Sequence, residues 1–417
     1  MRFRSGCAVT FALLTLLWTP LARAEDWPQW RGPRGDGTST EKDVPTKWSE
    51  TENVQWKVDV PGTGHSSPVV VGEKIFLTTA LEKEQKRVLI CFDRRDGNKL
   101  WESVVLSAPL EGKHPLNSYA SATPACDGER VFVSFLEKPK IELVCYDLSG
   151  KELWRKSPGE FHSVHGFCSS PVVYRDLIIL NCDQDADAWI VAYDRKTGEE
   201  RWRTDRPNKT RSYCTPLIAE LAGKTQMVLS GSKSVASYDP DTGKQFWVMD
   251  GPTEQFVASL VYTQGVLFVT GGFPQLHILG VDPSGSGNVT KTHILWRDHR
   301  GVSYVPSPVA HDQWFFIVSD GGIGSCFEAK TGKLLWKERL GRHHSASAVY
   351  AAGHVYFLDD DGITHVLKAG PTFELVSENA LGENAYASPA ISRGQIFIRT
   401  TQHLWCIGKP RTETANR

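Results

Sequence analysis

Tyr193-Asp194-Arg195-Lys196-Thr197-Gly198-Glu199-Glu200-Arg201-Trp202 is the stretch that decides the fold, because its pattern returns along the chain. A second full copy runs from Tyr238 to Trp247, and shorter copies end at Trp101, Trp154 and Trp336. In each copy an apolar run ends in an aromatic and an acidic residue, a turn with Gly follows, and a Trp lies in the next run. Asp and Gly are typical of tight turns, so the pattern predicts two antiparallel strands joined by a hairpin.

A second motif marks the start of each repeat. A small residue, then Ser or Thr, then Pro precede a run of apolar residues, with the prolines at Pro68, Pro124, Pro171, Pro216, Pro308 and Pro389. These prolines stand 56, 47, 45, 92 and 81 residues apart. Each of the two long intervals holds a copy without proline, at Ala258-Ser259-Leu260 and Ala346-Ser347-Ala348. The chain therefore contains eight repeats of about 46 residues, each long enough for four short strands.

The two ends of the repeat array complement each other. The eighth repeat ends near Pro410 after a third strand at 404–407, without a fourth. Residues 54–58 contain a Trp that lies 45 residues before Trp101, so this segment has the character of a fourth strand. Pairing the two would close a ring and cover its open edges. We predict an all-β fold, an eight-bladed β-propeller of four-stranded antiparallel blades in one domain over residues 25–410, followed by a tail at 411–417.

The residues that recur within the repeats are predicted to be structural. The tryptophans at one position of the repeat are expected to pack between blades: Trp101, Trp154, Trp202, Trp247, Trp296 and Trp336. The aspartates that start the hairpins are expected to bind nearby backbone amides of the turn: Asp93, Asp147, Asp194 and Asp239.

Residues 1–24 have the pattern of a signal peptide. Arg2 and Arg4 precede an apolar stretch from Ala8 to Trp18, and Ala22-Arg23-Ala24 offers a cleavage site with small residues. No later stretch approaches the roughly 20 consecutive apolar residues that a membrane-spanning helix needs. We expect a periplasmic or secreted protein that is soluble after cleavage near Ala24.

The charge balance argues against nucleic acid as a partner. The chain has 47 Lys and Arg residues against 48 Asp and Glu residues, so no field of one sign covers the surface. Binding of nucleic acid or of an anionic membrane is therefore not expected.

The hairpin motif resembles the repeat of the pyrroloquinoline-quinone (PQQ) propeller superfamily, in which an aromatic residue and Asp are followed by Thr-Gly-Lys and then Trp. Tyr193 to Trp202 and Tyr238 to Trp247 are the best matches. The resemblance implies the propeller fold and two classes of function. One class is the quinoprotein dehydrogenases, and the other is a non-catalytic group of BamB-like scaffolds. We include exported PQQ-like repeat proteins in the second class. Since a fold does not specify a function, the function must be argued from a site.

The enzyme class is the alternative interpretation. A PQQ-dependent and Ca²⁺-dependent oxidoreductase acting on an alcohol or sugar must hold a flat acidic cofactor and a calcium ion. Alcohol-oxidising members of the superfamily cover the cofactor with a disulfide between adjacent cysteines, and this sequence has no Cys-Cys pair. The resemblance therefore carries no catalytic residue onto this chain, and the catalytic residues stay unknown.

One face of the predicted propeller gathers polar and aromatic residues. The connections into the innermost strands emerge beside the loops between the second and third strands of each blade, so together they form one rim of the central channel. The candidate ligand-binding residues on this rim are His65, His114, His162, His165, Arg211, Tyr213, His299, Tyr304, Arg342, His343, His344 and Tyr386. Such a rim suits a peptide, a protein partner, a small polar ligand or a metal bound by imidazoles.

Two further features leave alternatives open. Asp183, Asp185 and Asp187 begin like a calcium-binding loop, but Ala188 stands where that loop needs its turning Gly. Eight cysteines follow residue 24, and Cys168 and Cys214 hold similar places in consecutive repeats, although the sequence cannot establish whether they pair. The sequence thus favours an exported, non-catalytic binding or scaffold propeller that holds its partner at the channel rim, without a cofactor.

Overall fold

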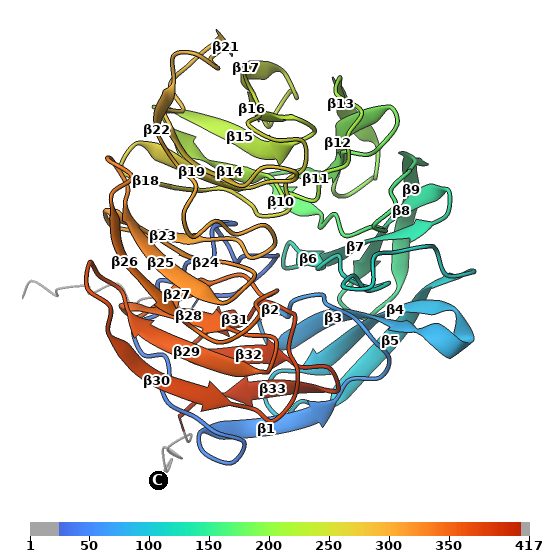
Figure 1. Cartoon of the computed structure of the whole chain (residues 1–417). Coiled ribbons are helices and arrows are strands. Elements are labelled where there is room, and N and C mark those ends of the chain that lie inside the picture. Colours follow the sequence, from blue (N-terminus) through green and yellow to red (C-terminus); the bar gives the residue numbers. More distant parts are fainter. Residues whose placement is uncertain (1–24, 410–417) are drawn as a thin grey trace, which may run out of the picture.

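The protein is described by a computed structural model over residues 25–409, so the predicted signal peptide and tail lie outside the described residues. Eight antiparallel sheets follow one another around a ring, and the colours of Figure 1 change from blue to red in that order. The fold is an eight-bladed β-propeller, as predicted, and its one described helix is the short 3-10 turn η1 (Glu82–Glu84). None of the described helices is long and apolar enough to cross a membrane.

Each blade is built from strands that are consecutive in sequence, with the innermost strand first. The first blade contains β2 (Val69–Val71), β3 (Lys74–Leu81), β4 (Lys86–Asp93) and β5 (Lys99–Ser107), and the second contains β6 (Ala125–Cys126), β7 (Arg130–Glu137), β8 (Lys140–Asp147) and β9 (Glu152–Glu160). The third blade contains β10 (Val172–Tyr174), β11 (Leu177–Cys182), β12 (Ala188–Asp194) and β13 (Glu200–Arg206), and the fourth contains β14 (Leu217–Leu221), β15 (Lys224–Gly231), β16 (Ser234–Tyr238) and β17 (Gln245–Asp250).

The second half of the ring continues in the same way. The fifth blade contains β18 (Val261–Thr263), β19 (Val266–Gly271), β20 (His277–Val281) and β22 (Ile294–Asp298), and the sixth contains β23 (Val309–His311), β24 (Trp314–Val318), β25 (Ile323–Glu328) and β26 (Leu334–Arg339). The seventh blade contains β27 (Val349–Ala351), β28 (His354–Leu358), β29 (Ile363–Lys368) and β30 (Leu375–Ala380). The eighth contains β31 (Ala390–Ser392), β32 (Gln395–Arg399) and β33 (His403–Ile407), and β1 (Val54–Asp59) is its outer strand.

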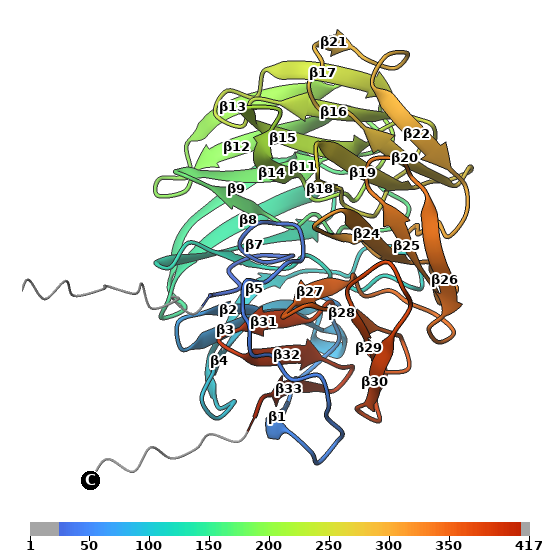
Figure 2. The same cartoon turned by 90° about the vertical axis from the view of Figure 1, so that its left-hand side faces the viewer.

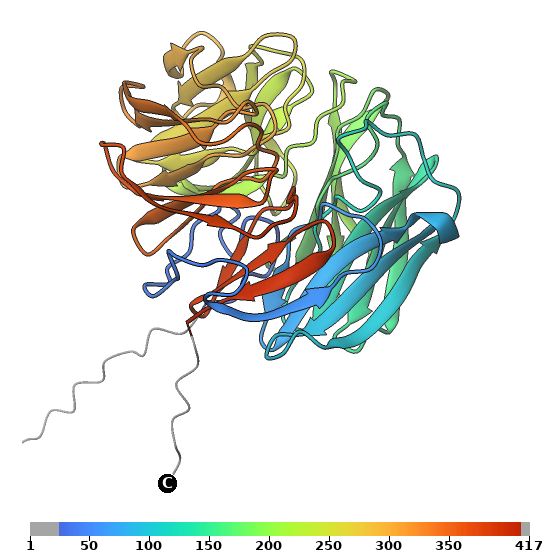
Figure 3. The ribbon, with the colours of Figure 1, turned by 60° about the horizontal axis from the view of Figure 1, so that its bottom comes forward.

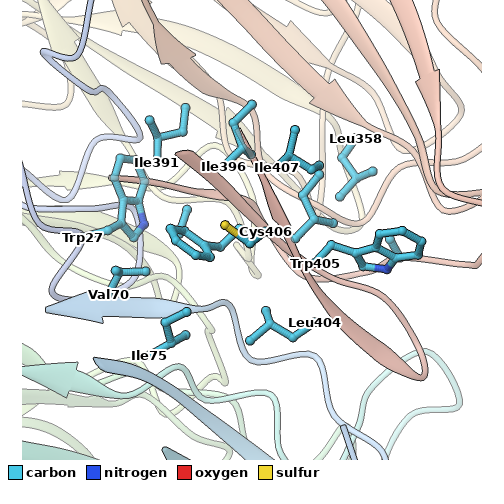
Figure 4. Packing of buried hydrophobic residues seen from close by; sticks show 14 of the residues in the cluster. Trp27, Val70, Ile75, Leu358, Ile391, Ile396, Leu404, Trp405, Cys406 and Ile407 are labelled. Atoms are coloured by element: carbon cyan, nitrogen blue, oxygen red, sulfur yellow. The ribbon is translucent and has the colours of Figure 1, made fainter. Parts of the chain in front are cut away.

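The ring closes as the sequence predicts. β1 pairs antiparallel with β33, with Lys57 opposite Trp405, and the blue and red strands lie side by side in Figures 1 and 3. Buried side chains from both ends of the chain share one core there, among them Trp27, Val70 and Leu404. Figure 4 shows these residues converging between the first and last blades. The seam is thus closed by strand pairing and by apolar burial together.

The repeated Trp residues join neighbouring blades, and the repeated Asp residues shape the hairpins. The indole nitrogen of Trp101 donates to the carbonyl of Leu148 in the next hairpin at 3.1 Å, and Trp154 donates to Arg195 at 3.2 Å. Asp194 accepts the turn amides of Lys196 and Thr197 at 2.9 and 3.0 Å. Both predicted roles of the motif, packing for Trp and turn formation for Asp, are confirmed at these positions.

The fifth blade departs from the repeat. The hairpin between its third and fourth strands, β20 and β22, is replaced by a longer connection. In this connection β21 (Gly287–Asn288) pairs in parallel with β17 of the fourth blade. The indole nitrogen of Trp247 still donates to the carbonyl of Pro283, the residue after Asp282, as in the other blades, and it donates to Gln226 in addition. The Gly-rich stretch that interrupts the sequence pattern thus becomes an added fifth strand.

An N-terminal segment at 26–41 crosses the end of the central channel and bonds to the inner strands of blades on both sides. The carbonyl of Pro28 accepts the amide of Cys126 at 2.7 Å, and Gly37 accepts the amide of Tyr350 at 2.9 Å. Arg31 is 2% exposed and donates to the carbonyls of Ser307 and Pro308. Figure 2 shows this blue segment before it reaches β1. The segment therefore closes one end of the channel.

Candidate functional site

The channel contains a cavity of about 340 Å³ that opens at the predicted rim. Trp30, from the crossing segment, lies at its far end and forms a floor. The small-Ser/Thr-Pro motif places Ser67, Ser170 and Thr215 on the wall just above, where the innermost strands begin. The channel is therefore a blind pocket with a single mouth, a shape typical of binding sites.

Hydroxyl groups of the repeat motif join the blades around this pocket. The amide of Ser307 donates to the hydroxyl of Ser347 at 3.0 Å, and the amide of Ser347 donates in turn to Ser388 at 2.9 Å. The same link runs from Ser67 to Thr123 and from Thr123 to Ser170, each at 2.9 Å. We call this series of Ser and Thr residues the hydroxyl belt. It holds the innermost strands together and gives the lower wall its polar character.

Seven of the twelve predicted rim residues line the pocket: His65, His114, His165, Tyr213, Tyr304, His343 and Tyr386. The connections into seven different blades supply them, as the propeller geometry requires. The rings contact one another along the wall: His65 lies 4.8 Å from Tyr386 and His114 lies 5.4 Å from His165, between ring centroids. The upper wall is thus largely aromatic.

The other five predicted residues lie outside the pocket wall. Arg211 pairs with Asp185 at 2.9 Å and reaches the ring of His165 at 3.4 Å, so it buttresses the wall. His344 is fully buried behind the rim. The remaining three, His162, His299 and Arg342, are exposed on the same face but are not part of the pocket wall.

Two imidazoles of the wall, those of His65 and His165, are held in their neutral form. Burial lowers the pKa of His65 to about 4, and the cations of Arg399 and Lys113 act in the same direction. Burial, Arg211 and His114 also lower the pKa of His165. Near neutral pH each of these rings therefore offers one donor and one acceptor. The wall suits polar, uncharged groups better than a concentrated charge.

The thiol of Cys168 and the hydroxyl of Ser345 are poor nucleophiles. Burial raises the pKa of Cys168 to about 12, so the thiolate that would react is scarce. Ser345 donates to Asp360 at 3.0 Å, and the same carboxylate binds His343, so no imidazole is placed to activate this serine. The arrangement favours binding over covalent catalysis. Cys168 and Cys214 are not joined by a disulfide.

Each aspartate of the predicted acidic loop pairs with a basic side chain. Asp183 is fully buried and forms two bonds to Arg206, at 2.9 and 3.1 Å. Asp185 pairs with Arg211, and Asp187 pairs with Lys209 at 2.6 Å. Within residues 25–409 no group of three His, Cys, Asp or Glu side chains is arranged to hold a metal ion. Each of the three aspartates thus serves a different ion pair.

Exposed apolar side chains lie on the face where the pocket opens. Leu116 is 64% exposed and Val164 is 65% exposed, and both lie in connections that also supply pocket residues. Phe273 and Leu276, from the β19–β20 loop, add about half-exposed side chains; the carbonyl of Phe273 accepts the amide of Gln255 at 3.2 Å. A polar pocket within an apolar margin suits a partner that covers the mouth and inserts a group into it.

Sequence reasoning missed the floor and the lower wall. Trp30 belongs to a segment outside the repeats, so no periodicity marks it as a channel residue. The hydroxyls of Ser67, Ser170 and Thr215 were visible as a repeated motif, but the motif indicates strand starts and not the direction of a side chain. Asp320, whose oxygens accept the amides of Tyr304 and Val305 at 2.7 and 3.0 Å, carries no sequence signal at all.

Comparison with known proteins agrees with this architecture. A family model described as outer membrane protein assembly factor BamB matches residues 38–135, 85–249 and 288–370, more than half of the chain. Outer membrane protein assembly factor BamB of Burkholderia pseudomallei (strain K96243) is 22% identical over 387 residues, which cover 87% of this chain and 91% of that protein.

Quinone-dependent enzymes are also similar. The 1-butanol dehydrogenase (quinone) of Thauera butanivorans is 24% identical over 263 residues, which cover 58% of this chain but only 40% of the enzyme. The crystal structure of quinohemoprotein alcohol dehydrogenase from Comamonas testosteroni superposes with a TM-score of 0.63 at 14% identity, covering 93% of this chain and 81% of that one. At that identity the likeness shows the shared fold.

Proposed function

This chain belongs to the family described as outer membrane protein assembly factor BamB, and from that premise we propose that it is an exported, non-catalytic binding module. Its ligand is a segment of a protein partner, held at the mouth of the channel. The observation that carries the proposal is the blind pocket with neutral polar walls inside an apolar margin.

The proposal follows from what each part of the site can bind. Leu116 and Val164 offer apolar area at the mouth, which drives association without reference to charge. The neutral rings of His65 and His165 and the hydroxyl belt offer donors and acceptors to a polar or aromatic side chain that enters the pocket. A small polar ligand could occupy the same pocket by the same contacts. The peptide is preferred because the apolar margin extends beyond the pocket.

Export is part of the proposal. We propose that residues 1–24 are removed as a signal peptide and that the protein then acts in the periplasm or outside the cell. Mass spectrometry of the protein from its host should find Glu25 as the first residue. Retention of residues 1–24 in the cytoplasmic fraction would contradict it.

Cross-linking in extracts of the host's cell envelope tests the binding site. We expect cross-links from the mouth to a partner, and we expect the double variant His114→Ala/Leu116→Ser to lose them, because both side chains are exposed and line the pocket. The double variant His162→Ala/Leu100→Ser is the matched control, since these exposed residues lie outside the pocket. Equal cross-linking by the two variants would place the partner on another surface.

The quinoprotein oxidoreductase is the second candidate, favoured by the likeness to the Thauera and Comamonas enzymes. The aromatic wall and Trp30 fit a flat ring. The donors for calcium do not fit, because Asp320 is the only carboxylate that residues 25–409 place in the pocket wall, whereas calcium takes about six to eight oxygen ligands. We therefore derive no catalytic step for this chain.

A further inference from the structure

A second cavity, of about 350 Å³, lies at the seam where the ring closes. Its wall includes Glu73 from the β2–β3 turn, Arg94 from the β4–β5 hairpin and Arg393 from the β31–β32 turn. Gln55 of β1 and Lys409 complete the side near the chain end. These turns emerge on the face opposite the channel mouth, so this cavity is separate from the pocket described above.

Arg94 is a buried cation without a carboxylate partner. It is 3% exposed, and its Nε and Nη2 atoms donate to the side-chain oxygen of Gln395 at 2.9 and 2.7 Å. Nη2 also donates to the carbonyl of Ser392 at 2.7 Å. Its Nη1 atom is buried and has no hydrogen-bond partner within residues 25–409. An unpaired buried cation is costly, so a missing anionic partner is indicated.

An equivalent arginine elsewhere in the ring shows what the partner would be. Arg195 has the same place in the third blade as Arg94 has in the first: each follows the hairpin Asp, and each carbonyl accepts the indole N–H of the preceding blade's Trp. The guanidinium of Arg195, however, binds two carboxylates, Asp127 at 3.1 Å and Asp176 at 3.4 Å. The repeat therefore satisfies this arginine with carboxylate oxygens where it can.

At the seam one of those carboxylates is absent and the other is paired with a different arginine. Ser392 begins the turn between β31 and β32, and it stands at the position that Asp127 has in the turn between β6 and β7. Glu73 stands at the position of Asp176, but its carboxylate pairs with Arg393 at 2.7 Å. Arg393 is further neutralised by Asp26 and Lys409 by Asp43. Arg94 is left as the cation in the cavity wall that lacks a carboxylate.

We propose that this cavity is a binding site for an oxyanion, a carboxylate or phosphate group whose oxygens accept from Nη1 of Arg94. The amide of Gln55, which donates to the carbonyl of Lys409 at 2.9 Å, and the ammonium of Lys409, which pairs with Asp43, lie on the same wall. Each has a further hydrogen to donate to the remaining oxygens. An anion bound there would touch the first blade, the last blade and β1, and it would therefore stabilise ring closure.

The test measures melting temperature with inorganic phosphate and with acetate, each at constant ionic strength set with chloride. We expect a saturable rise with at least one anion, about 2 °C at roughly ten times its Kd. Arg94→Met should abolish the rise, whereas Arg195→Met should keep it. A rise with acetate alone identifies a carboxylate ligand, and a rise with phosphate alone identifies a phosphate ligand. No saturable rise with either anion, or an equal rise in Arg94→Met, would overturn the proposal.

A second measurement tests anion binding even if Arg94→Met does not fold. The ³¹P line of phosphate should broaden on addition of the wild-type protein, and Lys409→Gln, whose side chain is 62% exposed, should weaken the broadening severalfold. Excess acetate should reverse the broadening if both anions share the site. A phosphate line unchanged by wild-type protein, combined with no effect of acetate on melting, would refute the site without any Arg94 variant.

Discussion

Gly150 lies against the indole ring of Trp101 in the preceding blade, so closely that a Cβ atom on this glycine would come within 2.8 Å of the ring. The same indole donates to the carbonyl of Leu148 in the same hairpin. Gly97 and Gly198 meet Trp56 and Trp154 in the same way. Gly is therefore needed in the motif both for its positive φ and for the space that the neighbouring Trp occupies.

Replacing this glycine should cost more than backbone strain alone. Gly150→Ala puts a methyl group into the Trp101 ring and also strains a residue at φ +89°, so we expect a loss of about 2–4 kcal/mol in the free energy of unfolding. Gly223→Ala is the matched control, because φ is +80° and its Cβ would meet no atom within 4 Å. Urea unfolding of both variants decides, and equal losses would show that the Trp contact contributes nothing.

The hydroxyl belt makes a second prediction. Ser347→Ala removes the acceptor of the buried amide of Ser307, and an unpaired buried amide costs about 1–3 kcal/mol. Ser67 has the same place in the first blade, but within the described residues its hydroxyl accepts no amide. Ser67→Ala should therefore cost less than half as much, as measured by urea unfolding. A Ser67→Ala loss as large as that of Ser347→Ala would refute the role assigned to the belt.

Acid should destabilise the fold through the half-buried His65 and the buried His344. Burial lowers the pKa of His65 and of His344 to about 4, against 6.5 for the unperturbed side chain. The unfolded chain therefore takes up these protons first, so stability is full above about pH 6.5 and falls as the pH decreases toward 4. Each histidine can contribute about 3 kcal/mol at most to this loss.

The variant His344→Gln should reduce that pH dependence. The ring of His344 lies beside His365, 6.1 Å away, and within residues 25–409 both of its nitrogens are buried without a hydrogen-bond partner. Burial therefore outweighs the favourable charge of Asp359 and disfavours the protonated ring. Urea midpoints at pH 7.5, 6, 5 and 4.5 should converge in this variant. His162→Gln, at an exposed position, should keep the slope of the wild type. An unchanged slope in His344→Gln would assign the acid sensitivity to other groups.

The binding of PQQ with Ca²⁺ offers the sharpest separation of the two candidate functions. Because Asp320 is the only carboxylate that the described residues place in the pocket wall, we expect no rise in melting temperature that requires both PQQ and Ca²⁺, and no dye-linked oxidation of alcohols or sugars. A rise that needs both together, and that Asp320→Asn abolishes, would establish the oxidoreductase instead.

The fold could be predicted because its determinants are local and repeated. Asp194 and Gly198 shape one hairpin, Trp154 packs on it from the preceding blade, and the pattern recurs until the number of blades can be counted. Strand β1 could be assigned because Trp56 keeps the interval of the repeat.

The site was less predictable because its residues depend on where side chains point. His65 and His343 were found, since the loops that carry them must meet at one rim. His344 differs from His343 by one position and points into the interior, a distinction that no spacing contains. Trp30 and Arg94 acquire their roles only through contacts with blades far away in sequence.

The segment that closes the channel also determines when the pocket can exist. Arg31 bonds to the carbonyl of Ser307, 276 residues later, and Gly37 bonds to Tyr350. Contacts of such long sequence separation form late in folding, because the intervening chain must first be ordered. A chain emerging in N-to-C order must therefore extend into the seventh blade, where Tyr350 lies, before the segment that carries Trp30 can form both contacts. Until then the inner strands of the early blades stay exposed, and folding is expected to be slow and sensitive to aggregation.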